Sequence, residues 1–185
     1  MSKDVNVLVV LADGFEEVEA LCPIDMLRRS GAHVTLAALE NKIVVSSHHV
    51  TFVCDALLDA VKDQDWDAIV LPGGGKGAEN LAASEAVLTT VVRLFNEGKL
   101  VAAICASPAV VLGGSGILEG RKVTCYPGCD SAAPAIVFDH TKRVVRDGNL
   151  ITSEGAGTAM EFAMEIVGYL FGEESRSALE KRVIY

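Results

Sequence analysis

The sequence has 185 residues, of which 50% are hydrophobic, 5% aromatic and 22% charged, and this composition excludes a disordered chain. The length is that of one domain, which we expect to span residues 1–185. The formal net charge of −9 argues against a surface for nucleic acid or for an anionic membrane. No apolar run reaches the roughly 18 residues of a membrane span, and the first residues lack the pattern of a signal peptide. Five cysteines without framework spacing indicate a reducing compartment, so we expect a cytoplasmic protein.

Short apolar runs alternate with helix-period runs along the chain. We expect strands at residues 5–12, 33–39, 68–71, 100–104 and 150–152. We expect helices at residues 15–30, 84–97, 107–113 and 158–171. The last of these helices begins with Thr158 and Glu161, which have the spacing of a capping box. The alternation predicts a doubly wound α/β sandwich, with a mostly parallel sheet and helices on both faces.

Residues 114–149 are rich in turn signals and are expected to be the irregular part of the chain. Near their end, residues 143–147 and 150–153 flank Gly148 and Asn149, which predicts a β-hairpin. In doubly wound sheets, ligands bind beyond the carboxyl ends of the strands. We therefore look for chemistry in the segments that directly follow strands.

Cys105 directly follows the predicted strand 100–104. Pro108 suits the first turn of a helix, and Ala103 and Ser107 are small enough for a tight strand-to-helix turn that exposes a nucleophile. A thiol at a helix N-terminus is favoured as the thiolate by unpaired N–H groups, so we expect Cys105 to be the most reactive of the five thiols. The alternative is a small buried residue at the end of a core strand.

A second group of residues follows the first strand. At helical spacing, one apolar stripe is formed by Phe15, Val18, Cys22 and Met26. Glu19 projects onto this stripe, whereas Glu16 and Glu17 project away from it. A buried carboxyl is paired, protonated or functional, although Glu19 could also reach water at the edge of the stripe. If it lies near a thiolate, Glu19 is expected to have a raised pKa and to donate a hydrogen bond to sulfur.

A glycine-rich loop, residues 73–77, follows the strand 68–71. It matches neither common nucleotide-binding pattern, but consecutive glycines allow backbone N–H groups to approach a small anion or oxyanion. Cys125 and Cys129 lack a matching second pair of cysteines, so we expect no zinc site.

Together, residues 12–19, 71–74, 103–108 and 152–158 resemble the ThiJ/PfpI superfamily. Within it, the chain is most similar to the branch of the Parkinson-linked protein deglycase DJ-one, and the resemblance runs in order over about residues 4–172. It implies a flavodoxin-like fold of the class I glutamine-amidotransferase type, a homodimer and activity without a cofactor.

The resemblance also implies roles for individual residues. Cys105 matches the reactive cysteine of the family, and Glu19 matches the carboxylic acid that hydrogen-bonds its sulfur. The backbone N–H groups of Gly74 and Ala106 match the donors that bind an oxyanion. Because the protease-like branch has a histidine where this chain has Ala106, we expect no peptidase activity.

This chain departs from the family pattern near the expected site. A histidine that is frequent in the branch is replaced by Tyr126, whose phenol is a poor base at neutral pH. Glu154 and Ala156 replace the usual arginine and proline. Of two arginines near the site, Arg29 is retained and His48 stands in the place of the other. These changes affect the expected substrate preference.

The resemblance implies a glyoxalase or deglycase that acts on methylglyoxal, glyoxal or their early adducts on thiols and amines, including glycated proteins. The alternative is a non-enzymatic redox sensor or chaperone-like stress protein, switched by oxidation of Cys105. A homodimer is expected to use the first helix, because Leu21, Ile24 and Leu27 lie off the stripe that carries Glu19.

Overall fold

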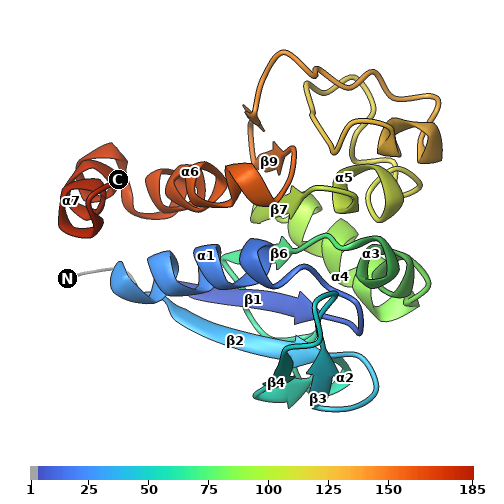
Figure 1. The fold of residues 1–185 in the computed structure, drawn as a ribbon, viewed down its shortest axis with the longest axis horizontal. Coiled ribbons are helices and arrows are strands. Elements are labelled where there is room, and N and C mark those ends of the chain that lie inside the picture. Colours follow the sequence, from blue (N-terminus) through green and yellow to red (C-terminus); the bar gives the residue numbers. More distant parts are fainter. Residues whose placement is uncertain (1–3) are drawn as a thin grey trace.

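A seven-stranded sheet forms the centre of the computed structural model, which describes residues 4–185 (Figure 1). Residues 1–3, part of the start compared above with a signal peptide, lie outside the described residues. The strand order is β5-β2-β1-β6-β7-β9-β8, and every neighbouring pair is parallel except β8 and β9. The strands are β1 (Asn6–Leu11), β2 (His33–Ala38), β5 (Ala56–Leu57), β6 (Ala68–Leu71), β7 (Leu100–Ile104), β8 (Val144–Asp147) and β9 (Leu150–Ser153).

Helices cover both faces of this sheet, as the alternating pattern predicts. One face carries α1 (Glu17–Arg29) and α6 (Ala159–Phe171), and α7 (Glu173–Val183) packs against α6. The other face carries α2 (Leu58–Val61), α3 (Gly75–Ala82), α4 (Glu85–Asn96) and α5 (Ser107–Val110). The expected doubly wound fold is therefore confirmed.

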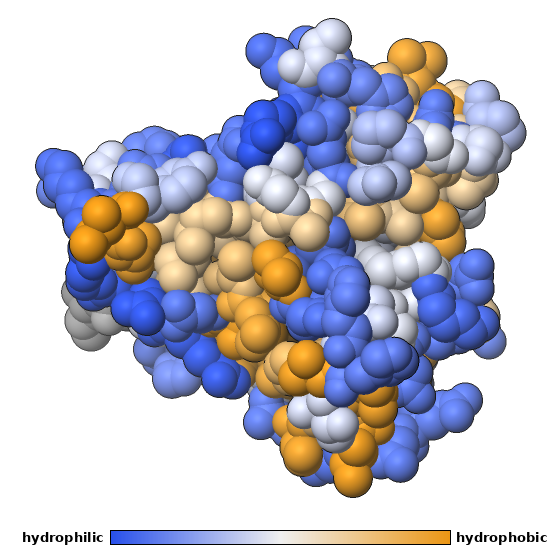
Figure 2. Space-filling model, viewed as in Figure 1, coloured by the Kyte–Doolittle hydropathy of each residue, from blue (hydrophilic) through white to orange (hydrophobic). Residues whose placement is uncertain are grey.

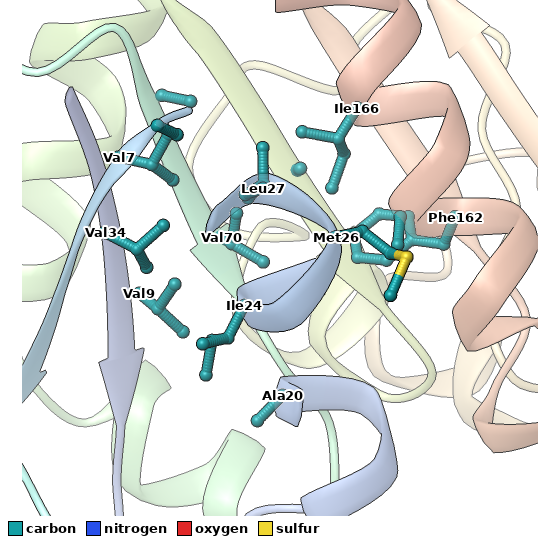
Figure 3. Close-up of a cluster of buried hydrophobic side chains, with 14 of the residues drawn as sticks. Val7, Val9, Ala20, Ile24, Met26, Leu27, Val34, Val70, Phe162 and Ile166 are labelled. Carbon is teal, nitrogen blue, oxygen red and sulfur yellow. The ribbon is translucent and has the colours of Figure 1, made fainter. Parts of the chain in front are cut away.

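The core under α1 and α6 shows why these segments take this arrangement (Figure 3). Val7 and Val9 point from β1 toward Ile24 and Leu27 of α1, and all four side chains are buried. Alternate residues of β1, including Leu8 and Val10, point to the opposite core. Both faces of the strand are therefore apolar, as expected for a parallel strand between two layers of helices.

Several elements differ from the sequence-based expectation. A separate hairpin of β3 (Ile43–Val45) and β4 (Thr51–Val53) was not expected, and its short strands carry little periodic signal. The capping box of α6 is not formed, because Glu161 binds Arg143 and the Thr158 hydroxyl donates to Gly155 O. The expected hairpin around Gly148 is present, with Gly148 at φ 62° in its turn.

The buried face of α1 is also rotated relative to the expected stripe. Val18 is 43% exposed, whereas Ile24 and Leu27 belong to the core. The expectation that Ile24 and Leu27 form an outer face is therefore wrong, because both pack between α1 and the sheet. Among residues 4–185, no helix is both long enough and apolar enough to cross a bilayer.

Candidate functional site

Cys105 occupies a sharp turn between β7 and α5. Its φ of 65° is in the left-handed region, which is strained for a residue with a side chain. Backbone hydrogen bonds fix this conformation, because Cys105 N–H donates to Ser153 O at 2.9 Å and Cys105 O accepts from Tyr126 N–H at 2.8 Å. The Ser107 hydroxyl donates to Pro72 O and ties the turn to the glycine loop. This is the geometry of a nucleophile elbow.

Glu19 is brought to this turn by the first turns of α1. Its side chain is buried, with only 1% of the residue exposed. Oε2 accepts a 2.8 Å hydrogen bond from Gly73 N–H, whereas Oε1 has no hydrogen-bond partner of standard geometry among the described residues. Burial raises the pKa of Glu19 to about 7, against smaller lowering effects of Cys105 and Gly73. The expected raised pKa is confirmed, and the carboxyl exchanges a proton near neutral pH.

The thiol of Cys105 is protonated in this arrangement. Burial, followed by the charge and hydrogen bond of Glu19, raises the pKa of Cys105 to about 12. The N–H groups of Gly74 and Ala106 lower this pKa but do not outweigh the other effects. A resting thiolate, as the sequence suggested, is therefore not what this structure shows. The physical reasons are the burial of the thiol and the Glu19 carboxyl beside it, whose effects exceed that of the N–H groups.

The glycine loop must lack side chains to let these groups meet. A Cβ on Gly73 would lie 2.6 Å from Cys105 Cβ and 2.7 Å from Glu19 Oε2. A Cβ on Gly74, which has φ 84°, would lie 2.2 Å from Gly14 O. The loop therefore brings backbone N–H groups against the thiol and the carboxyl, as the glycine pattern indicated.

Tyr126 covers one side of the site. Besides its backbone bond to Cys105, its ring packs over Gly155, where an added Cβ would lie 3.2 Å from Tyr126 Cδ2. The same Cβ position lies 3.9 Å from Glu19 Oε1, so the ring and the carboxyl border one space. The residue is 52% exposed, which places Tyr126 between the buried pair and solvent.

His48 lies at the rim, and no contact between it and the thiol is seen. Its Nδ1 is 3.1 Å from Glu17 Oε1, and the Glu17 hydrogen bond raises the pKa of His48. The ligand atoms of Glu16, Glu17 and His48 lie within 4.8 Å of one another. The three side chains already bind one another and Ser47, and His48 is largely exposed. The cluster is therefore a group of hydrogen-bonded side chains at the rim of the site.

Arg29 is not brought to the thiol within the described chain. It lies in the last turn of α1, whereas Glu19 lies in the first. Ten residues of helix separate them by roughly 15 Å. The guanidinium of Arg29 binds Asp25 at 2.8 Å, which is an ordinary pairing along a helix.

The contacts of three site residues, Gly73, Ser107 and Ser153, could not be read from the sequence, although Ser107 was noted as a small residue of the elbow and Gly73 as part of the glycine loop. Gly73 supplies the donor to Glu19, Ser107 joins the elbow to Pro72, and the carbonyl of Ser153 holds Cys105 N–H. Each acts through a contact with a segment far away in the sequence. Gly73 and Ser107 lie in the segments that follow β6 and β7, whereas Ser153 is the last residue of β9.

Taken together, the site holds a protonated thiol beside a carboxyl group that titrates near neutrality. Two N–H groups, of Gly74 and Ala106, point at the sulfur and could bind an oxygen that develops negative charge on a group attached to it. Such an arrangement can perform nucleophilic addition with a general base in contact.

Comparison with known proteins identifies the family. Residues 5–168 match the model of the DJ-1/PfpI family. Protein DJ-1 homolog B of Arabidopsis thaliana is 44% identical over 97% of this chain, and a deglycase of Pyrococcus abyssi is 34% identical over 89% of this chain and 99% of its own length. This chain spans only 41% of the Arabidopsis protein. The solved structure of oxidized DJ-1 from Toxoplasma gondii superposes with a TM-score of 0.93 at 38% identity, over 98% of each chain. The chain therefore belongs to the DJ-1/PfpI family.

Proposed function

We propose that this protein is a cysteine-dependent glyoxalase or deglycase, acting in the cytoplasm without a cofactor on methylglyoxal, glyoxal or their early protein adducts. The observation that carries this proposal is the buried Glu19 carboxyl, whose charge and hydrogen bond act on the Cys105 thiol and whose pKa is raised by burial to about 7. The deglycase name of the Pyrococcus abyssi relative supports the same class of reaction.

The first step is addition of the thiol to the aldehyde carbon. Glu19, ionised in about half of the molecules near pH 7, takes the thiol proton as sulfur attacks. The C–S bond forms while the carbonyl π bond breaks, and its electron pair goes to oxygen. The Gly74 and Ala106 N–H groups stabilise that oxyanion, and its protonation yields a hemithioacetal.

The second step is an internal rearrangement. Glu19 removes the proton from the former aldehyde carbon, which gives an enediol, and a proton is returned to the neighbouring carbon. The former aldehyde carbon is thereby oxidised to a thioester while the ketone carbon is reduced to an alcohol. Water then cleaves the thioester, releasing a hydroxy acid and restoring the thiol. No external oxidant or reductant is consumed.

The test is lactate formation from methylglyoxal by the purified protein. Cys105→Ser should abolish the activity, because the hydroxyl of serine is a far weaker nucleophile. Glu85→Gln, at an exposed position in the first turn of α4, is the matched control and should retain full activity. Equal lactate formation by wild type and Cys105→Ser would refute the proposal.

A redox-sensing function is the alternative supported by a specific observation. The two N–H groups that point at the Cys105 sulfur would also stabilise the oxygens of a sulfinate, and a protonated Glu19 would donate to one of them. Mass spectrometry after peroxide treatment distinguishes the two functions. Selective addition of two oxygens to Cys105, without measurable lactate formation by the untreated protein, would favour the sensor.

A further inference from the structure

Two further thiols, Cys125 and Cys129, lie next to the site on the segment that carries Tyr126. Cys125 is completely buried, whereas Cys129 is partly exposed, and both are free thiols. The chain turns sharply between them through Pro127 and Gly128, which has φ 92°. The catalytic arrangement proposed above uses neither cysteine.

Their separation is limited by a shared acceptor. The Cys125 thiol donates to Tyr126 O at 3.4 Å, and the Cys129 N–H donates to the same oxygen at 3.0 Å. The distance between the Cys125 sulfur and the Cys129 backbone nitrogen therefore cannot exceed the sum of these two hydrogen-bond lengths. Burial, followed by the charges of Asp130 and Cys129, raises the pKa of Cys125.

We propose that Cys125 and Cys129 form a dithiol that closes reversibly to an intramolecular disulfide. Two thiols held by one turn have a high effective concentration toward each other, and this favours an intramolecular bond over two separate adducts. The oxidant is a low-molecular-weight disulfide such as oxidised glutathione. The more exposed Cys129 attacks it and releases one glutathione thiol, leaving a mixed disulfide. Cys125 then attacks the Cys129 sulfur, which releases the second thiol and completes the exchange.

The reaction is expected to be slow at neutral pH. Burial, followed by the charge of Asp130, raises the pKa of Cys129, and burial raises that of Cys125 to about 12. Because the thiolate is the attacking species, exchange should accelerate as the pH rises. Asp130→Asn removes the nearby charge and should accelerate it at a fixed pH.

Closure of this pair would act on the neighbouring site through Tyr126. Tyr126 lies between the two cysteines in the chain, and its N–H holds Cys105 O at the elbow. Its ring borders the space beside Glu19. A bond between Cys125 and Cys129 tightens the turn that positions both groups, so we expect severalfold slower lactate formation. This consequence, unlike the disulfide itself, rests on the proposed function.

The disulfide can be tested on one tryptic peptide. Residues 123–142 form a single peptide with Cys125 and Cys129 as its only cysteines, whereas Cys22, Cys54 and Cys105 each fall in other peptides. The full-length protein is incubated at pH 8 with oxidised glutathione, and remaining thiols are then trapped with iodoacetamide. We expect this peptide to lose the mass of two hydrogens and to carry no label, and dithiothreitol should reverse both changes.

Variants make the result decisive. Cys105→Ser should form the same internal disulfide, because Cys105 takes no part in it. Cys129→Ser should form none, and oxidised glutathione should slow its lactate formation less than that of wild type. A peptide that stays doubly alkylated, or one cross-linked to the peptide with Cys105, would overturn the pairing.

A disulfide that forms without slowing lactate formation would overturn the coupling to Tyr126. Absence of lactate from the reduced wild type would instead count against the proposed function alone.

Discussion

At the scale of single residues, the chemistry depends on how one proton is shared between Glu19 and Cys105. Burial raises the pKa of both groups; the charge and hydrogen bond of Glu19 raise that of Cys105 further, whereas the hydrogen bond with Cys105 lowers that of Glu19. The carboxyl loses its proton near pH 7, while the thiol keeps its own to much higher pH. The reactive thiolate therefore arises by proton transfer to Glu19 rather than by a lowered pKa of the cysteine.

Glu19→Gln should separate nucleophilicity from catalysis. The amide keeps the size of the side chain but can neither accept the thiol proton nor move protons during the rearrangement. Lactate formation should fall by about 10²-fold or more, in the range typical for loss of a general base. Because the negative charge is gone, the pKa of Cys105 should fall, and iodoacetamide should label it faster at pH 8. Unchanged lactate formation would leave Glu19 as a structural residue.

The same carboxyl should make stability depend on pH. Its pKa rises from an ordinary value of 4.5 to about 7 in the folded chain, so the native state binds this proton more tightly than the unfolded state does. The resulting stabilisation is complete below pH 4.5 and is lost as the pH rises through about 7. The full effect is on the order of 3 kcal/mol.

Urea unfolding of wild type and Glu19→Gln at pH 5 and pH 8 measures this effect, since other titrating groups cancel in the difference. The Gln variant should gain stability relative to wild type between the two pH values. A difference that does not change with pH would show that Glu19 has an ordinary pKa.

At the scale of elements, prediction from sequence worked where a periodic pattern was long or a turn signal was sharp. The segments 68–71 and 100–104 are apolar throughout and were predicted with the observed bounds. The hairpin β3–β4 could not be predicted, because strands of three residues carry no usable period and pair only with each other. The first helix was predicted and its buried face only in part: Glu19 and Met26 are buried as expected, but Val18 and Ile24 are equally apolar and only packing against the sheet and α6 distinguishes them.

The loop between β6 and α3 should be intolerant of a side chain at one position and tolerant at the next. Gly74→Ala places a Cβ 2.2 Å from Gly14 O in a residue with φ 84°, so the loop must move. We expect a loss of several kcal/mol in unfolding free energy, above the roughly 1–3 kcal/mol typical of backbone strain alone.

Gly75→Ala is the matched control, because nothing lies within 4 Å of its added Cβ and the residue begins α3. It should be neutral or slightly stabilising, since alanine favours a helix over glycine by roughly 1 kcal/mol. Urea denaturation of both variants provides the measurement. Equal stability of the two would show that the close approach of Gly74 to Gly14 is not a constraint.

At the scale of the whole molecule, the parallel sheet explains which predicted site residues meet. Cys105 and the glycine loop follow adjacent strands, with Leu71 of β6 paired to Ala103 of β7, so their proximity follows from the fold class. Glu19 joins them because α1 starts at the same edge of the sheet (Figure 1). Positions that depend on how loops fold, such as His48, or on distance along a helix, such as Arg29, could not be placed from motifs.

The surface suggests where a second copy of the chain binds. Figure 2 shows apolar side chains gathered over the exposed side of α1 and the β3–β4 hairpin. The exposed apolar residues in these elements and the turn between them are Val18, Leu21, Ile43, Val45, Val50 and Val53. The hairpin is fixed to the start of α1 by hydrogen bonds from Ser47 N–H to Phe15 O and from Gly14 N–H to Val45 O, both 2.8 Å. A patch that spans two rigidly joined elements is suited to a twofold interface.

We therefore propose that the protein is a homodimer through this patch, and that a charge placed in it separates the two copies. Val53 is 71% exposed, so Val53→Glu should leave the fold of one chain intact while burying an unpaired carboxylate in the interface. Light scattering at micromolar concentration should report twice the chain mass for wild type and a reduced mass for the variant. Val137→Glu, at a position 88% exposed on the distant irregular segment, is the control and should remain dimeric. A monomeric wild type would refute the dimer, and a Val53→Glu variant that stays dimeric with native circular dichroism would place the interface elsewhere.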